Sequence, residues 1–260
     1  MAFGTTSSGT FYYFNNKQQS IPIVFIHGVG LTHEIWEPQL NFFKDYSAIS
    51  YDILGHGKTP LEKRKISFDD FSDQLINLLD ELKIDKIHLV GFSIGSLIAR
   101  DFAIKFNHRL KSLILLCSIY KRSQDQQKIV NERFEQAKKE LKLSKLALKR
   151  WFTDEYLEKN PDTYEKITSI LSANNMENFL KVYELFVTHK NNEDFNKIKA
   201  KTLIMTGEHD VGSTTAMSEE LNKIIQDSQL KIINNGKHLC GIECADNVNL
   251  TIKNFIDKNE

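Results

Sequence analysis

Short apolar segments alternate with amphipathic segments along most of the chain, and this alternation limits the possible folds more than any other feature. Apolar segments typical of strands lie at 21–26, 47–51, 86–91, 110–117, 201–207 and 229–235. Between several of them, as at 67–82 and 94–106, apolar residues recur at the spacing of a helix. The segment at 21–26 is almost continuously apolar, as in a strand buried on both faces. The pattern predicts an α/β fold, with a mostly parallel sheet covered by helices on both faces.

The two ends of the chain extend this pattern. A strand is predicted at 10–14, followed by a turn at Asn15, Asn16 and Lys17 and then by the strand at 21–26. Ser67 is expected to cap the helix at 67–82, with Asp70 at the capping-box position. Further helices are predicted near 216–225 and 247–256.

About 80 residues separate Cys117 from Lys201, far more than one crossover between parallel strands needs. This stretch is rich in Lys, Glu and Asn and has apolar residues at helical spacing. We therefore expect an α/β core in two parts, 1–118 and 196–260, interrupted by a helical insertion at 119–195 that lies over one end of the sheet. The alternative is that the helices of this insertion only pack on the core and have no gating role.

Charge and cysteine content exclude several classes of protein. Lys and Arg number 34, as do Asp and Glu, whereas a dedicated nucleic-acid binder carries a basic excess. No apolar run approaches the roughly 20 residues that span a bilayer, and the first residues do not have the pattern of a secretion leader. Three irregularly spaced cysteines suit a reducing compartment and do not form a zinc motif. We expect a cytoplasmic protein with no metal, no membrane partner and an undetermined oligomeric state.

The sequence Gly91-Phe92-Ser93-Ile94-Gly95 joins a predicted strand to a predicted helix. A serine between two glycines at such a turn is typical of a nucleophile elbow, in which the hydroxyl is exposed above the sheet. A glycine turn that merely contains a serine is the alternative. Ser93 is the candidate nucleophile.

A serine nucleophile needs a base and an acid that orients the base. Among eight histidines, His238 lies directly after the last predicted strand, where parallel sheets collect their functional loops. Asp210 follows the preceding strand and is the candidate acid, with Glu208 as the second choice. The order Ser93, Asp210, His238 is that of α/β-hydrolases. Acyl transfer also needs two backbone N–H donors for the developing oxyanion. Val29, in the sequence His27 to Gly30, and Ile94 are the candidates.

Together these motifs resemble the α/β-hydrolase superfamily, and within it the lid-bearing esterases and lactonases. The segments HGVG at 27–30, YDILGHGKT at 51–59, GFSIG at 91–95, TGEHD at 206–210 and KHLCGIE at 237–243 stand in the order of that family. The segment RWFTDEYLEKNP at 150–161 is similar to the cap of 3-oxoadipate enol-lactonases. This likeness implies that Trp151 lines the substrate pocket, and Phe152 is a second candidate.

The resemblance implies a hydrolase without a cofactor that acts on a small carboxylic ester or lactone. Two alternatives keep the same three residues and change the bond: a C–C bond hydrolase, and a carbamate or amide hydrolase. A ligand-binding receptor on a hydrolase fold is the third alternative, because a fold does not fix a function.

Overall fold

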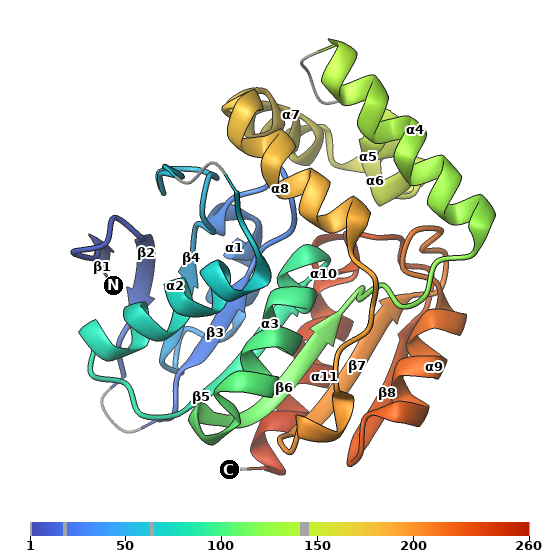
Figure 1. Ribbon diagram of the computed structural model, residues 1–260. Helices are drawn as coiled ribbons and strands as arrows, with labels where there is room; N and C mark the ends of the chain where they lie inside the picture. Colours follow the sequence, from blue (N-terminus) through green and yellow to red (C-terminus); the bar gives the residue numbers. More distant parts are fainter. Residues whose placement is uncertain (1, 18–19, 63–64, 141–145, 260) are drawn as a thin grey trace.

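The computed structural model describes residues 2–17, 20–62, 65–140 and 146–259 and contains an eight-stranded sheet (Figure 1). The strand order is β1-β2-β4-β3-β5-β6-β7-β8; β3 to β8 are parallel, whereas β2 is antiparallel to both of its neighbours. The strands are β1 (Ala2–Thr5), β2 (Phe11–Asn15), β3 (Ile23–Ile26), β4 (Ala48–Tyr51), β5 (Ile87–Phe92), β6 (Leu110–Leu116), β7 (Lys201–Gly207) and β8 (Ser228–Ile233). The predicted fold class is confirmed.

Helices cover both faces of the sheet (Figure 1). One face packs against α2 (Phe68–Glu81), α3 (Ile94–Lys105) and α9 (Thr215–Ile224), and the other against α1 (Glu37–Phe42) and α11 (Ala245–Asp257). Successive residues of a strand point to opposite faces. Val24 and Ile26 of β3 accordingly join the first core, and Phe25 joins the second. Burial on both faces explains the continuous apolar run at this strand.

The strand order brings two functional loops together. The central strand β3 pairs with β4 on one side and with β5 on the other. Chain connections therefore run in opposite directions from this point, which leaves a crevice beyond the carboxyl ends of the strands. The loop after β3 and the turn after β5 meet at this crevice.

Between β6 and β7, the described residues form α4 (Gln124–Glu140), α5 (Leu146–Trp151), α6 (Asp154–Lys159), α7 (Pro161–Ser172) and α8 (Met176–Thr188). We call these five helices the helical insertion. In Figure 1 they lie above the end of the sheet. Leu148 and Ile167 of the insertion pack in the same apolar cluster as Trp36 and Leu239 of the core. The insertion is thus joined to the core by continuous apolar packing.

The N-terminal strands differ from a simple hairpin. The turn predicted at Asn15, Asn16 and Lys17 does not pair β2 with β3, because β4 lies between them. Tyr13 of β2 instead lies opposite Ser50 of β4. The predicted cap of α2 is present, since the Ser67 backbone N–H donates to the Asp70 carboxylate at 2.8 Å. In the described ranges we find no helix that combines the length and the apolar character needed to cross a membrane.

Candidate active site

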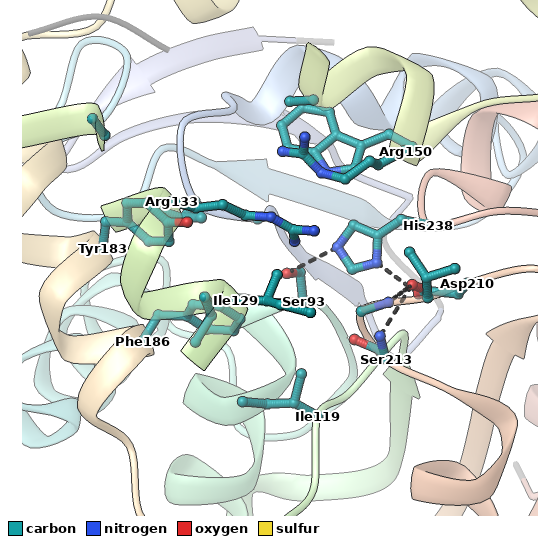
Figure 2. A pocket seen from close by; sticks show the side chains of 18 of the residues that line it. Ser93, Ile119, Ile129, Arg133, Arg150, Tyr183, Phe186, Asp210, Ser213 and His238 are labelled. Atoms are coloured by element: carbon teal, nitrogen blue, oxygen red, sulfur yellow. Dashed lines mark hydrogen bonds and ion pairs between the residues drawn. The ribbon is translucent and has the colours of Figure 1, made fainter. Parts of the chain in front are cut away.

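Ser93 lies on a sharp turn between β5 and α3. Its backbone has φ 55° and ψ −120°, a conformation that costs free energy for any residue with a side chain. The turn leaves Ser93 as the residue directly before the first turn of α3, with 5% of its surface exposed. The strained conformation directs the hydroxyl away from the strand and towards the crevice (Figure 2).

The glycines on either side of Ser93 allow the close packing that this turn requires. A Cβ atom on Gly91 would lie 2.2 Å from the carbonyl oxygen of Gly95. A Cβ atom on Gly95 would lie 2.4 Å from the carbonyl oxygen of Ile26 in β3. Only glycine leaves room for α3 to start directly against the sheet.

Ser93, His238 and Asp210 form a hydrogen-bonded line (Figure 2). The Nε2 atom of His238 lies 3.2 Å from the Ser93 hydroxyl, and Nδ1 donates to the Asp210 carboxylate at 2.6 Å. Asp210 follows β7 and His238 follows β8, so neighbouring strands deliver both side chains to one edge. Glu208, the second choice for the acid, is about half exposed and accepts from the backbone N–H of Asn235.

The charge on Asp210 is stabilised on both carboxylate oxygens. Its Oδ1 accepts from the backbone N–H groups of Gly212 at 2.8 Å and Ser213 at 3.0 Å, and Oδ2 faces His238. Burial opposes ionisation, but His238 and these donors outweigh it and hold the pKa of Asp210 below its usual value. Burial likewise opposes protonation of His238, and the Asp210 carboxylate outweighs it and raises the pKa of the imidazole. This arrangement can accept a proton from Ser93 and stabilise the resulting imidazolium.

The two candidate oxyanion donors come from loops that meet near Ser93. Ile94 is the first residue of α3, so its N–H has no acceptor within the helix. Val29 follows β3 and lines the cavity described below. Among the described residues, neither backbone N–H donates a hydrogen bond. Gly28 keeps this loop close to the turn, because a Cβ atom there would lie 2.8 Å from the Phe92 ring.

Buried histidines hold the loop that carries Val29. His56 Nε2 accepts from the Gly30 N–H at 2.8 Å, and His27 Nε2 accepts from the Ile53 N–H at 3.0 Å. Both rings must be neutral to accept in this way. Burial lowers the pKa of His27 to about 4 and that of His56 to about 3. Their roles are therefore structural.

A cavity of about 290 Å³ opens above Ser93, between the sheet edge and the helical insertion. Ser93, His238 and Val29 lie in its wall, together with Trp151 from the end of α5. The Trp151 ring centroid lies 6.4 Å from that of His238. Phe152 does not line this cavity; it is fully buried and stacks on Tyr156, so its placement in the pocket was wrong. Phe152 instead packs in the apolar cluster that joins the insertion to the core.

Several cavity residues had not been singled out from the sequence. α4 contributes residues at spacings of three or four, which form one face of the helix. α5 and α8 contribute further side chains. The set from these three helices comprises Gln126, Ile129, Val130, Arg133, Gln136, Ala137, Glu140, Ala147, Arg150, Phe179, Tyr183 and Phe186. The regular spacing on α4 was visible in the sequence, but the direction in which this face points was not.

The comparisons with known proteins agree with this geometry. The family model described as the α/β-hydrolase fold matches residues 21–243. The chain belongs to the α/β-hydrolase fold family. The predicted family is therefore confirmed, and the α/β-hydrolase core carries Ser93, Asp210 and His238 in the chain order of this family.

Named relatives of this α/β-hydrolase span almost its whole length. The (E)-2-((N-methylformamido)methylene)succinate hydrolase of Acinetobacter baylyi is 27% identical over 255 residues, covering 97% of this chain and 96% of the relative. The 3-oxoadipate enol-lactonase 2 of the same organism is 25% identical over 222 residues, covering 85% and 83%. The enol-lactonase structure from Burkholderia xenovorans LB400 has a TM-score of 0.90 at 22% identity, covering 98% and 100%. The predicted likeness to enol-lactonases and the prediction of a hydrolytic enzyme are confirmed.

Three potential metal ligands of this α/β-hydrolase lie close together. Atoms of Cys117, Asp210 and His238 all lie within 4.8 Å of one another. All three are engaged in hydrogen bonds, since Cys117 Sγ donates to the His238 carbonyl oxygen at 3.2 Å and His238 Nδ1 donates to Asp210. Burial raises the pKa of the Cys117 thiol well above its usual value, whereas a metal binds the thiolate. These contacts favour proton transfer over metal binding, and the absence of a metal or cofactor stays a prediction.

Proposed function

We propose that this α/β-hydrolase cleaves a small carboxylic ester or lactone through an acyl-enzyme on Ser93. The observation that carries the proposal is the hydrogen-bonded line Ser93–His238–Asp210, which lies in the wall of the cavity beneath the insertion. A serine hydroxyl is a weak nucleophile and becomes effective when an oriented base removes its proton. These three residues thus act as a catalytic triad.

The first half of the reaction acylates the enzyme. His238 Nε2 accepts the hydroxyl proton as Ser93 Oγ attacks the substrate carbonyl carbon. Negative charge develops on the carbonyl oxygen, where the N–H groups of Val29 and Ile94 stabilise it. His238 then donates the proton to the leaving alkoxide, and the ester bond breaks. Asp210 keeps Nδ1 protonated, so Nε2, which faces the Ser93 hydroxyl, is free to accept its proton.

The second half releases the acid. A water molecule loses a proton to His238 and attacks the acyl carbon, and Ser93 Oγ leaves with that proton. The helical insertion serves as a cap in this account, because it closes the cavity over Ser93 and limits the substrate to small molecules. Trp151 is part of the cap wall, and its ring centroid lies 6.4 Å from that of His238.

Names of the relatives support this range of chemistry. Two of the relatives are named for 3-oxoadipate enol-lactone, which supports a lactone as substrate. The relative named for an N-methylformamido-methylene succinate suggests a C–N bond as the second candidate. The same triad serves both, so the bond cleaved depends on the fit of the substrate in the cavity.

Turnover of three matched bond types tests the proposal: 4-nitrophenyl acetate, the lactone dihydrocoumarin and the amide 4-nitroacetanilide. We expect the ester and the lactone to be hydrolysed, and Ser93→Ala to lower kcat by at least about 10³-fold. Ser172→Ala is the matched control, since Ser172 is an exposed serine in the insertion. Cleavage of the amide alone would move the assignment to the second candidate. Ester turnover that survives in Ser93→Ala would contradict the mechanism.

A further inference from the structure

Two arginines of the cap extend into the cavity. Arg133 comes from α4 and Arg150 from α5, and both line the space above Ser93. Figure 2 shows the Arg133 guanidinium directed towards Ser93 and His238. Burial lowers the pKa of Arg150, and the nearby charge of Arg133 lowers it further. The two cations are therefore close enough to repel each other within the cavity.

The charge of Arg133 is not balanced by an acidic partner in the described part of the chain, where it has no ion pair or hydrogen bond. Arg122 provides a contrast. It also lines the cavity, but its guanidinium donates to the backbone carbonyl oxygens of Phe186 and Val187 and so joins the segment before α4 to α8. Glu140 is an acidic side chain in the wall, and it has an interaction of its own. A cation that lines a substrate cavity and is not paired with a carboxylate is suited to binding an anionic ligand.

Apolar side chains lie away from the two arginines. Ile119 and Phe186 lie on the other side of Ser93 from Arg133 and Arg150 (Figure 2). A small substrate that spans the cavity would meet positive charge at one end and apolar side chains at the other. This asymmetry would also fix which way round the substrate binds.

We propose that Arg133 and Arg150 form a subsite for a free carboxylate on the substrate, so that the enzyme prefers anionic esters or lactones over neutral ones. The inference rests on the proposed function, because the carboxylate must be bound while Ser93 attacks the scissile carbonyl. A planar guanidinium presents paired N–H donors that match a carboxylate, and such charge-assisted bonds are stronger than neutral ones. Arg133 and Arg150 are thus binding residues that select the substrate.

The test compares kcat/KM for two matched pairs of esters. One pair is mono-4-nitrophenyl adipate and its methyl ester; the other is 4-acetoxybenzoate and its methyl ester. The adipate pair carries the carboxylate in the acyl part of the ester, and the benzoate pair carries it in the leaving group. We expect the anionic member of at least one pair to be preferred about tenfold or more. Arg133→Gln should lower that preference about 10- to 100-fold, and Arg133→Lys should lower it less.

Lys128→Gln is the matched control, because Lys128 lies on the exposed side of the same helix. It should keep the preference of the wild type, and thermal melts of all variants identify any that do not fold. No preference for the anion in the wild type, or a preference that Arg133→Gln leaves unchanged, would overturn the subsite. If the subsite fails this test, the wild type should still hydrolyse the neutral esters and Ser93→Ala should not. That result would leave the proposed function in place. No turnover of any ester would instead remove the proposed function.

Discussion

The backbone N–H of Leu239 donates to the carbonyl oxygen of Trp151 at 2.9 Å, which joins the helical insertion to the loop that carries His238. The carboxylate of Glu243 adds to this junction. It accepts from the backbone N–H of Thr153 at 2.8 Å and from that of Lys237 at 3.1 Å. The position of the histidine therefore depends on the packing of α5 and α6.

We expect Glu243→Ala to reduce both stability and activity. The substitution removes the acceptor of two half-buried backbone N–H groups, which costs about 1–3 kcal/mol. His238 would also move relative to Ser93, and small displacements of a catalytic group reduce kcat, here by about tenfold or more. Urea unfolding and ester turnover measure the two effects. Glu219→Ala, at an exposed residue of α9, should leave both close to the wild type; equal behaviour of the two variants would refute the role of the junction.

Asp210→Asn should lower kcat by about 10³- to 10⁴-fold with little change in the fold. An amide cannot stabilise the imidazolium, and it can reverse the tautomer of His238. The pH profile gives a second readout. Neutral His238 is the base, so kcat/KM rises with pH through the pKa of this residue. Because Asp210 raises that pKa, the acid limb of the wild type should lie above the ordinary value of 6.5.

In Asp210→Asn the acid limb should move to lower pH, since the carboxylate that favours the imidazolium is gone. His108→Gln is the control, because His108 is exposed. An acid limb below pH 6.5 in the wild type, or one that stays in place in Asp210→Asn, would argue against the assignment of His238.

The buried histidines predict a loss of stability in mild acid. The folded-state pKa of His27 is about 4, whereas that of the unfolded chain is near 6.5. Below pH 6.5 the unfolded state binds more protons, so the stability is complete above pH 6.5 and falls as the pH falls towards 4. At pH 5 this histidine alone should cost about 2 kcal/mol. Urea unfolding at pH 7 and pH 5 measures the loss, which His27→Gln should reduce and His108→Gln should not. A stability that does not fall at pH 5 would contradict this account.

Gly95→Ala should destabilise the protein strongly, although alanine is the better helix former. Its Cβ atom would lie 2.4 Å and 2.6 Å from the carbonyl oxygens of Ile26 and His27. Such overpacking at the base of α3 costs about 1–3 kcal/mol or more. Gly241→Ala is the matched helical control, with its nearest contact at 3.4 Å from a Leu116 methyl carbon. The urea midpoint of Gly95→Ala should be clearly lower than that of Gly241→Ala. Similar midpoints would contradict this prediction and show that β3 shifts to make room for the added Cβ atom.

The meeting of the three candidate catalytic residues could be predicted from the sequence because they follow strands. Ser93 directly follows β5, while Asp210 and His238 lie in the loops after β7 and β8, and the carboxyl ends of parallel strands meet at one edge. Pattern and position together therefore located all three. The N-terminal strand β1 was missed, because its four residues are mostly exposed and lack an apolar pattern.

The helical insertion could be predicted only in outline. Helical spacing indicated helices between 119 and 195, but which face of each helix meets the cavity depends on how the insertion packs on the core. Phe152 was a second candidate for the pocket wall, and Arg133 and Arg150 were not singled out from the sequence. Local patterns do not encode such long-range packing.

Covalent labelling with a fluorophosphonate, followed by intact mass and peptide mapping, tests the central claim most directly. An activated serine attacks the phosphorus centre, so the wild type should gain one adduct, located on Ser93. Ser93→Ala and His238→Ala should gain none at the same reagent concentration, while His108→Gln should label like the wild type. An adduct on another residue, or a folded wild type that stays unlabelled, would contradict a Ser93 nucleophile activated by His238.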